Sequence, residues 1–163
     1  MYALIENNAV TKVGELAILF PDTSNPNSSF AAEQGALEVV EGEQKDQRFY
    51  WVTFDKYEIT GNVVTRTYVN TPKVLEDVTE TPEGGEPITT KGLKSQWIAQ
   101  AKASANSQLA STDWLVIRKA ERNVAIPSDV VAARAKIIAD CTAKEAAITA
   151  ATTIDELMQA LSN

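Results

Sequence analysis

The sequence predicts an α+β protein with a β-rich N-terminal part, built on hairpins, and a helical C-terminal part. In the first part, β-branched and aromatic residues form short runs separated by turn-forming residues. From residue 93 onward, apolar side chains recur every three or four residues, as in amphipathic helices. An acidic segment with Gly-Gly and two prolines lies between them. We therefore expect a β-rich domain at 1–77, a linker at 78–92 and a helical domain at 93–163.

Two hairpins supply the four predicted strands. The first turns at Asn7-Asn8, because asparagine tolerates a positive φ in a tight turn. The second turns at Thr60-Gly61-Asn62 between runs of β-branched and aromatic residues. Asp22–Ser29, which is dense in turn formers, is predicted to be a loop. The four predicted strands are Tyr2–Glu6, Val10–Val13, Phe49–Phe54 and Val63–Val69.

Three helices are predicted in the second half. The second helix begins after Pro127, and the third has Thr153 and Glu156 at capping-box spacing. Asp113–Arg118, between the first two helices, is a short apolar run that we expect to be a strand or a packed extended segment. The apolar stripes are Leu93, Trp97, Ala101, Ala105 and Leu109; then Val130, Val131, Ile137, Ile138 and Cys141; then Ile154, Leu157, Met158 and Leu161.

The composition argues against most catalytic chemistry. The chain has no histidine and one cysteine, Cys141, which removes the standard nucleophilic triads and Cys/His zinc sites. Its seven glycines form no phosphate-binding loop. We therefore expect a protein that is not an enzyme and uses no cofactor and no metal. Cys141 lies on an apolar stripe, so we expect a buried structural thiol.

Charge and hydropathy limit the kinds of partner that the sequence predicts. A net charge of −7, with lysines and arginines scattered along the chain, argues against binding to nucleic acid. No apolar run is long enough to span a bilayer, and the first residues lack the positive region of a signal peptide. We therefore expect no membrane contact and a cytoplasmic location.

Acidic residues leave one catalytic alternative open. Glycosidase-type carboxylate pairs meet in space and not at a fixed spacing, so a carboxylate-dependent hydrolase acting on glycans remains a rival reading. Asp55 and Glu58 flank the second hairpin and are more typical of exposed strand ends. The densest acidic cluster lacks the spacing of a calcium loop and is typical of a solvated linker. Its members are Glu76, Asp77, Glu80, Glu83 and Glu86.

Tryptophan and arginine residues are the best candidates for binding. The core is the favoured location for each of Trp51, Trp97 and Trp114. Trp114 is the strongest candidate for an exposed anchor, because it is expected in a connection and not on a regular face. Arg118 and Arg134 are expected in structural roles, and Arg134 is expected to pair with a carboxylate such as Asp113 or to extend to water.

Several segments together resemble small phage proteins encoded beside tail-fibre genes. The most characteristic is Leu109–Glu121 with its Thr-Asp-Trp block, which is similar to the end of phage tail-fibre assembly proteins. The alanine-rich extension after Ala139 departs from that pattern. The other similar segments are Met1–Val10, Asn25–Phe30, Thr65–Pro72, Ile126-Pro127 and Val130–Arg134.

The resemblance implies a function. It implies a chaperone that binds the tail-fibre subunit and aids its folding or trimerisation, through Asp113, Trp114 and Arg118 or through the N-terminal sheet. Self-association is left open. The expected location is the host cytoplasm during assembly and, because some such proteins stay on the fibre, the virion tail. The alternative is a permanent structural adaptor that links fibre to tail or baseplate.

Overall fold

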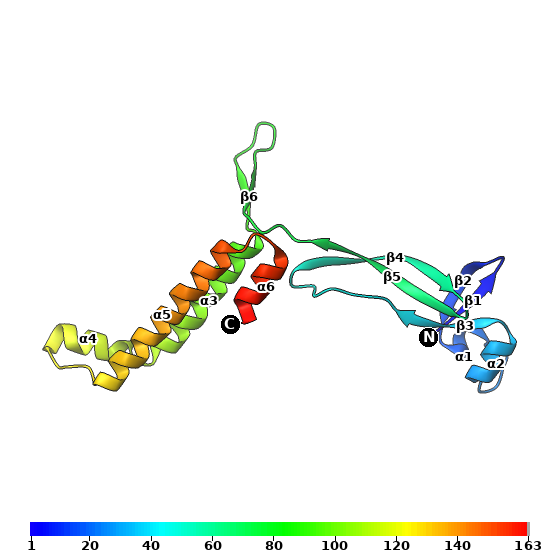
Figure 1. The fold of residues 1–163 in the computed structure, drawn as a ribbon, viewed down its shortest axis with the longest axis horizontal. Coiled ribbons are helices and arrows are strands. Elements are labelled where there is room, and N and C mark those ends of the chain that lie inside the picture. Colours follow the sequence, from blue (N-terminus) through cyan, green and yellow to red (C-terminus); the bar gives the residue numbers. More distant parts are fainter. Residues whose placement is uncertain (163) are drawn as a thin grey trace. The chain divides into compact units, whose positions relative to one another are not determined.

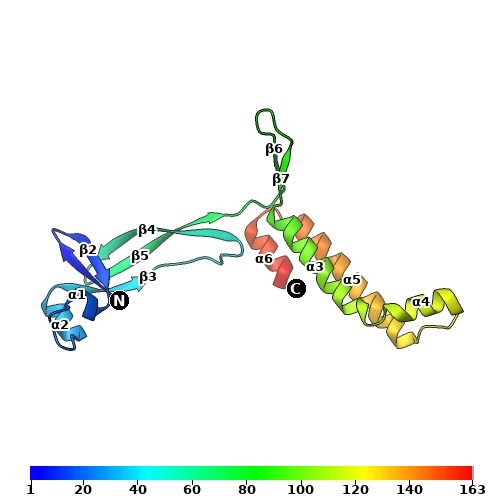
Figure 2. The same ribbon diagram turned by 180° about the vertical axis from the view of Figure 1, so that it is seen from behind.

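The computed structural model describes residues 1–162 and divides the chain into two compact units, Met1–Pro72 and Lys73–Asn163 (Figures 1 and 2). The first unit contains a five-stranded sheet, and the second contains the long helices. The predicted α+β class is therefore confirmed. The boundary between the units falls after Pro72, whereas the sequence placed the change of character at the segment 78–92.

The five strands of the first unit follow the order β2-β1-β3-β5-β4 across the sheet. Neighbouring strands are antiparallel, except that β3 and β5 are parallel. The sheet therefore has two edges, β2 and β4. The strands are β1 (Tyr2–Glu6), β2 (Ala9–Gly14), β3 (Ala36–Glu41), β4 (Tyr50–Thr60) and β5 (Val63–Pro72).

Both predicted hairpins form, and their turn residues explain their geometry. Glu6 pairs with Ala9, and the two turn residues Asn7 and Asn8 have φ of 51° and 60°, as a type I′ turn requires. Between β4 and β5, Gly61 has a φ of 58° at the first turn position, which is typical of a type II′ turn. The two turns set the registers of their hairpins.

Two short helices accompany the sheet, α1 (Leu16–Leu19) and α2 (Ser28–Glu33). Asn27 caps α2, because its Oδ1 accepts a hydrogen bond from the Phe30 N–H at 2.9 Å. The loop predicted at Asp22–Ser29 therefore ends at this cap, and its last two residues belong to the helix. The buried apolar residues of this unit are Ala3, Leu19, Ala31, Ala36, Phe49 and Val64.

The second unit is built on two antiparallel helices, α3 and α5 (Figures 1 and 2). All three predicted helices are confirmed. Thr153 and Glu156 begin the last one, where the Glu156 N–H donates to Thr153 Oγ1 at 3.2 Å. The buried apolar residues are Leu93, Ala105, Leu115, Ile148, Ala151, Ile154, Leu157 and Ala160. The helices are α3 (Leu93–Ala110), α4 (Asp113–Arg122), α5 (Ser128–Ala150) and α6 (Ile154–Ser162).

The strand or extended segment predicted at Asp113–Arg118 is wrong, because these residues open the helix α4. A short run of β-branched and aromatic residues does not distinguish a strand from a helix by its periodicity. The ends of the segment favour a helix. Asp113 lies in the first turn and Lys119 and Arg122 in the last, which complements the helix dipole. Asn123 ends the helix in the left-handed conformation, with a φ of 53°.

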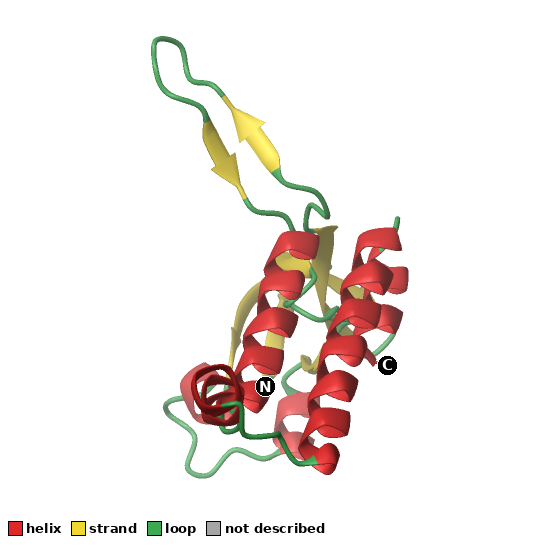
Figure 3. Ribbon diagram, turned by 90° about the vertical axis from the view of Figure 1, so that its left-hand side faces the viewer, coloured by secondary structure: helices red, strands yellow, loops and turns green. Residues whose placement is uncertain are grey.

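The acidic segment predicted as a linker or mobile loop contains a two-stranded hairpin. Strand β6 (Val78–Glu80) pairs with β7 (Ile88–Thr90), and the hydroxyls of Thr79 and Thr89 lie 2.8 Å apart across the pair. Figure 3 shows the hairpin projecting away from α3 and α5. Gly84 lies at its tip with a φ of 74°. Because every residue of both strands is exposed, the hairpin contributes nothing to the core.

The residues before this hairpin hold the start of α3. The N–H groups of Leu93 and Lys94 donate to the carbonyls of Val74 and Leu75 at 2.9 and 3.0 Å. The Gly92 N–H donates to Asp77 Oδ1 at 2.8 Å. These bonds satisfy N–H groups that have no partner within the first turn of a helix. The two chain segments lie so close that a Cβ on Gly92 would be 2.2 Å from the Glu76 carbonyl oxygen.

We predict that Gly92→Ala destabilises the second unit by about 1–3 kcal/mol, because the added methyl group forces two backbone segments apart. Gly85→Ala is the matched control, since its Cβ would meet only ordinary contacts with Pro82. Urea unfolding followed by far-UV circular dichroism checks both variants. Equal unfolding midpoints for Gly92→Ala and the parent would contradict the close approach.

We predict that the second unit loses stability in acid. Hydrogen bonds from the Ser95 hydroxyl and then the Gly92 N–H hold the pKa of Asp77 below its ordinary value of 3.8. Hydrogen bonds from the Thr152 N–H and hydroxyl likewise hold the pKa of Glu156 below its ordinary value of 4.5. A carboxyl group whose pKa is lower in the folded chain than in the unfolded chain adds stability at pH values above the unfolded pKa. This added stability is lost as the pH falls through the folded pKa. The melting temperature should therefore decrease when the pH is lowered below about 4.5.

The variant Glu156→Gln should show a shallower decline of melting temperature between about pH 5 and pH 3, because the glutamine cannot be protonated in this range. Glu83→Gln removes the same charge from the exposed tip of the β6–β7 hairpin and serves as its control. It should keep the pH dependence of the parent. Identical slopes for Glu156→Gln and the parent would show that the Glu156 cap does not contribute to acid sensitivity.

Candidate protein-binding site

Helix α4 presents large apolar side chains to solvent. Trp114 and Ile117, which lie one turn apart, are each 56% exposed. Val116 is also exposed, and Leu115 is the one buried residue of the helix. A water-exposed group of large apolar side chains on a helix is typical of a surface that binds another protein.

Arg118 lies against Trp114. Its guanidinium carbon is 5.0 Å from the indole ring centre, a distance at which a cation–π attraction is effective. The two residues are four apart in the helix, so their side chains share one face. Two of the three predicted binding residues, Trp114 and Arg118, therefore form one surface, and both residue types are enriched in protein interfaces.

The third predicted residue, Asp113, lies where the end of α3 and the start of α4 contact α5. Its Oδ1 lies 2.9 Å from an Arg134 guanidinium nitrogen, which confirms the expected pairing of Arg134 with a carboxylate. Arg134 Nη1 also donates to the Leu109 carbonyl at 2.9 Å and to Thr112 Oγ1 at 2.6 Å. A single arginine on α5 thus binds the end of α3 and the start of α4. Asp113 helps to hold the helix that carries Trp114.

The expectation that the tryptophans are core residues is wrong for two of them. Trp51 is 63% exposed on β4 and Trp114 is 56% exposed, whereas Trp97 is half-buried on α3. Trp114 also lies on a regular helix, and not in the connection that singled it out. Trp114 is exposed, as expected. The physical reason is that its side of the helix α4 is left open to water.

A second cluster, which the sequence reasoning missed, lies on the sheet of the first unit. The rings of Phe54 and Tyr57 are 5.1 Å apart, and the Arg66 guanidinium lies over Phe54 and Tyr68 at 5.4 and 5.5 Å. Arg66 also pairs with Glu41 at 3.5 Å. The register of β4 and β5 places Phe54 opposite Tyr68 and Tyr57 opposite Arg66. The period-two spacing of Arg66 and Tyr68 was the available signal.

The Tyr68 hydroxyl ties this cluster together by donating a hydrogen bond to the Glu41 carboxylate. That bond raises the pKa of Tyr68, and burial raises it further. The tyrosine therefore stays protonated and acts as a donor. Phe54 remains 47% exposed, so the cluster offers a partly apolar surface with a central cation.

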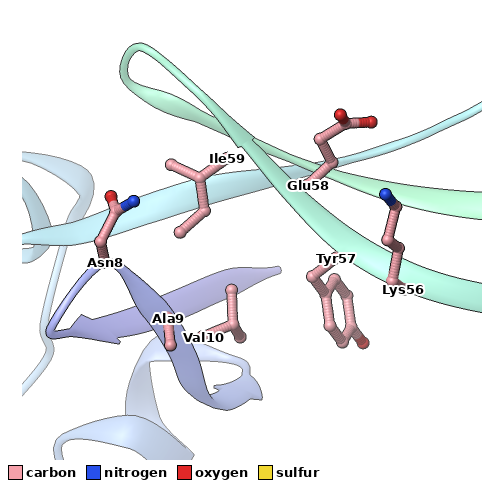
Figure 4. A pocket seen from close by; sticks show the side chains of 7 residues that line it. All are labelled: Asn8, Ala9, Val10, Lys56, Tyr57, Glu58 and Ile59. Atoms are coloured by element: carbon pink, nitrogen blue, oxygen red, sulfur yellow. The ribbon is translucent and has the colours of Figure 1, made fainter.

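A depression of about 440 Å³ lies between the β1–β2 turn and β4 (Figure 4). Glu58 is the one acidic residue in its lining, so the depression does not supply the pair of carboxylates that a glycosidase uses. Asp55 lies outside it on a β-bulge, near the Thr67 hydroxyl. The residues that line the depression are Asn8, Ala9, Val10, Lys56, Tyr57, Glu58 and Ile59.

Cys141, the one cysteine of the chain, lies in an environment typical of a structural residue. Cys141 is half-buried and not fully buried as expected, and its Sγ lies 3.4 Å from Glu145. Burial raises the pKa of its thiol, and the neighbouring Glu145 raises it further. Glu145 in turn pairs with Lys102 at 3.0 Å. Within residues 1–162, no cluster of acidic or cysteine side chains has the arrangement of a metal site.

None of the helices described for residues 1–162 combines the length and hydrophobicity needed to cross a membrane. Comparison with protein-family models, curated proteins and solved structures finds no significant match.

We predict that Arg134→Met destabilises the second unit by about 1.5–3 kcal/mol, because it removes charge-assisted hydrogen bonds from a half-buried junction. Arg122→Met, on the exposed last turn of α4, is the control and should cost less than about 1 kcal/mol. Thermal unfolding monitored by circular dichroism measures both changes. An Arg134 variant no less stable than the Arg122 variant would contradict the role of this junction.

Proposed function

We propose that this protein is a non-catalytic binding protein that acts as a phage tail-fibre assembly chaperone. The observation that carries the binding role is the exposed face of α4, where Trp114, Ile117 and Arg118 lie on a helix anchored by Arg134. The Thr112-Asp113-Trp114 block, which resembles the end of tail-fibre assembly proteins, carries the assignment of the partner.

The energetics of α4 support a protein partner. Burying a tryptophan and an isoleucine removes large apolar areas from water, at about 25 cal/mol for each Å². Because Arg134 already holds the start of the helix, less conformational entropy is lost on binding than for a free helix. An exposed, preorganised aromatic residue beside an arginine has the composition of a binding hot spot.

A tail-fibre subunit is a partner that needs such help. Intertwined β-rich chains form many non-local contacts, so they fold slowly and expose strand edges that aggregate. A protein that covers apolar surface of the subunit until its strands pair would raise the yield of folded fibre. The net charge of −7 keeps the chaperone itself soluble while it holds such a chain.

The chaperone role is tested by expressing the tail-fibre subunit with and without this protein and measuring the soluble trimer. We expect much more trimer in its presence. Equal amounts of trimer in both cases would overturn the chaperone role. Mass spectrometry of purified particles then separates a dissociating chaperone from a permanent tail adaptor, because only an adaptor is required in stoichiometric amounts.

We predict that Trp114→Ala weakens binding to the tail-fibre subunit at least about 30-fold, which corresponds to a hot-spot contribution of about 2 kcal/mol. The loss follows from removing the largest apolar contact of α4. Isothermal titration calorimetry with the full chain gives the dissociation constants. Ile138→Ala is the matched control, because Ile138 is similarly exposed, at 52%, but lies on α5.

The control variant should bind within about threefold of the parent. Circular dichroism shows whether each variant keeps its helices, so a folding defect is not read as a binding defect. If Trp114→Ala binds as tightly as the parent, α4 is not the contact surface. If both variants lose affinity equally, the binding surface extends over α5 and is not specific to α4.

A further inference from the structure

The β6–β7 hairpin has an apolar face that is open to water. Val78 pairs with Thr90, and Ile88 pairs with Glu80. Residues that pair, and residues two positions apart in a strand, share one face, so Val78 and Ile88 lie on the same side of the hairpin. Ile88 is 61% exposed, and Val78 is also exposed. A two-stranded hairpin is marginally stable in water by itself, and packing against a helix is one way to stabilise it.

The same hairpin is acidic. Glu80, Glu83 and Glu86 lie within residues 78–90, which contain no lysine and no arginine. All three side chains are exposed, and no ion pair within residues 1–162 involves them. Glu80 lies directly beside Ile88 on the apolar face. A surface that complements this face therefore combines apolar and basic side chains.

Helix α4 has this combination. Trp114 and Ile117 are each 56% exposed, and Arg118 and Arg122 follow Trp114 by about one and two turns on the same side of the helix. Among the described residues, neither arginine takes part in an ion pair. Glu121 is the one acidic residue close to them in the helix. The basic residues of α4 are Arg118, Lys119 and Arg122.

The hairpin and α4 lie at opposite ends of α3 (Figures 1 and 2). The Gly92 N–H bond to Asp77 fixes the base of the hairpin at the start of α3, and Arg134 fixes α4 at its end. An 18-residue helix is about 27 Å long, and Figure 3 shows the hairpin projecting away from α3 and α5. The two surfaces therefore do not meet within one chain, and only the hairpin of another copy can reach α4.

We propose that the β6–β7 hairpin of one copy packs on α4 of a second copy when no other partner covers that helix. The apolar face of the hairpin then covers Trp114 and Ile117, and its glutamates lie near Arg118 and Arg122. Two chains with a net charge of −7 repel each other in general, so copies associate where opposite charges face each other. Because each copy has one hairpin and one α4, two copies can exchange both contacts and close as a two-fold dimer.

The inference goes beyond the proposed function and does not rest on it, because it concerns this chain alone. A second copy and the tail-fibre subunit would bind the same face of α4, so they exclude each other. Self-association then keeps Trp114 out of water until the subunit replaces the second copy.

Sedimentation equilibrium of the full chain tests whether copies associate. We expect the mass to rise with concentration to at least that of two chains. The dissociation constant should rise at least about fivefold between about 50 and 500 mM sodium chloride, because salt screens exposed charges. A mass of one chain at all concentrations up to about 0.5 mM overturns the proposal, since even weak association is detected in this range.

Two charge-reversed chains test which surfaces make the contact. The hairpin variant is Glu80→Lys with Glu86→Lys, and the α4 variant is Arg118→Glu with Arg122→Glu. Each alone should associate at least about 30-fold more weakly than the parent, because like charges then face each other. An equal mixture of the two variants should associate within about threefold of the parent, because both contacts regain opposite charges.

The matched control is Glu6→Lys with Glu33→Lys, which changes the net charge as the hairpin variant does, at exposed positions of the first unit. It should associate at least as tightly as the parent. Unchanged association of either reversed variant, or a mixture that stays dissociated, would overturn the proposal.

A neutral α4 variant, Arg118→Gln with Arg122→Gln, keeps residues that favour a helix and guards against a folding defect. Circular dichroism measures its helix content. It should associate at least about fivefold more weakly than the parent, because two favourable charges are lost. Association equal to that of the parent would count against α4 as the contact surface.

Adding the tail-fibre subunit separates this inference from the proposed function. The subunit should release the second copy as it binds α4. If copies associate through the hairpin but the subunit does not bind, the proposed function fails and the inference stands. If the chain is monomeric and the subunit binds, the inference fails and the proposed function stands. A subunit that binds through Trp114 without releasing the second copy also overturns the inference.

Discussion

The second unit depends on one arginine. Arg134 on α5 donates to the Leu109 carbonyl near the end of α3 and to the hydroxyl of Thr112, and it pairs with Asp113 at the start of α4. Three helices therefore meet at one guanidinium group, on a side chain that is only 18% exposed. Its planar array of donors suits this task, because it satisfies several acceptors in fixed directions, which lysine does not. Where α4 begins, and which side chains it presents, follow from this junction.

Each unit exposes large aromatic side chains beside an arginine. In the second unit, α4 buries Leu115 and leaves Trp114 and Ile117 each 56% exposed, with Arg118 over the Trp114 ring. In the first unit, Phe54 is exposed and the Arg66 guanidinium lies over its ring. Under the function proposed above, such surfaces would meet the apolar side chains of a partner chain that has not finished folding.

Sequence patterns predicted the fold better than the sites. The hairpin at Asn7-Asn8 and the three helices α3, α5 and α6 were found because turn chemistry and helical periodicity are local properties. The second predicted stripe is only partly buried, because Val131 and Ile138 are about half exposed. Helix α4 was missed because its apolar residues are β-branched and aromatic, and its identity depends on Arg134, which lies 21 residues after Asp113 in the chain. The cluster around Arg66 was missed because the period-two spacing of Arg66 and Tyr68 does not say which residues of the neighbouring strand lie opposite them, and only the register places Phe54 there. Trp114 was selected because it was expected in a connection, whereas it lies on the helix α4, and its exposure is a property of tertiary packing.

The central claim is that α4 contacts the tail-fibre subunit through position 114. Site-specific photo-cross-linking tests it most directly, with benzoyl-phenylalanine in place of Trp114 in one chain and in place of Ile138 in another. We expect the tail-fibre subunit to be cross-linked efficiently from position 114 and weakly from position 138. Efficient cross-linking from position 138 with none from position 114 would contradict it.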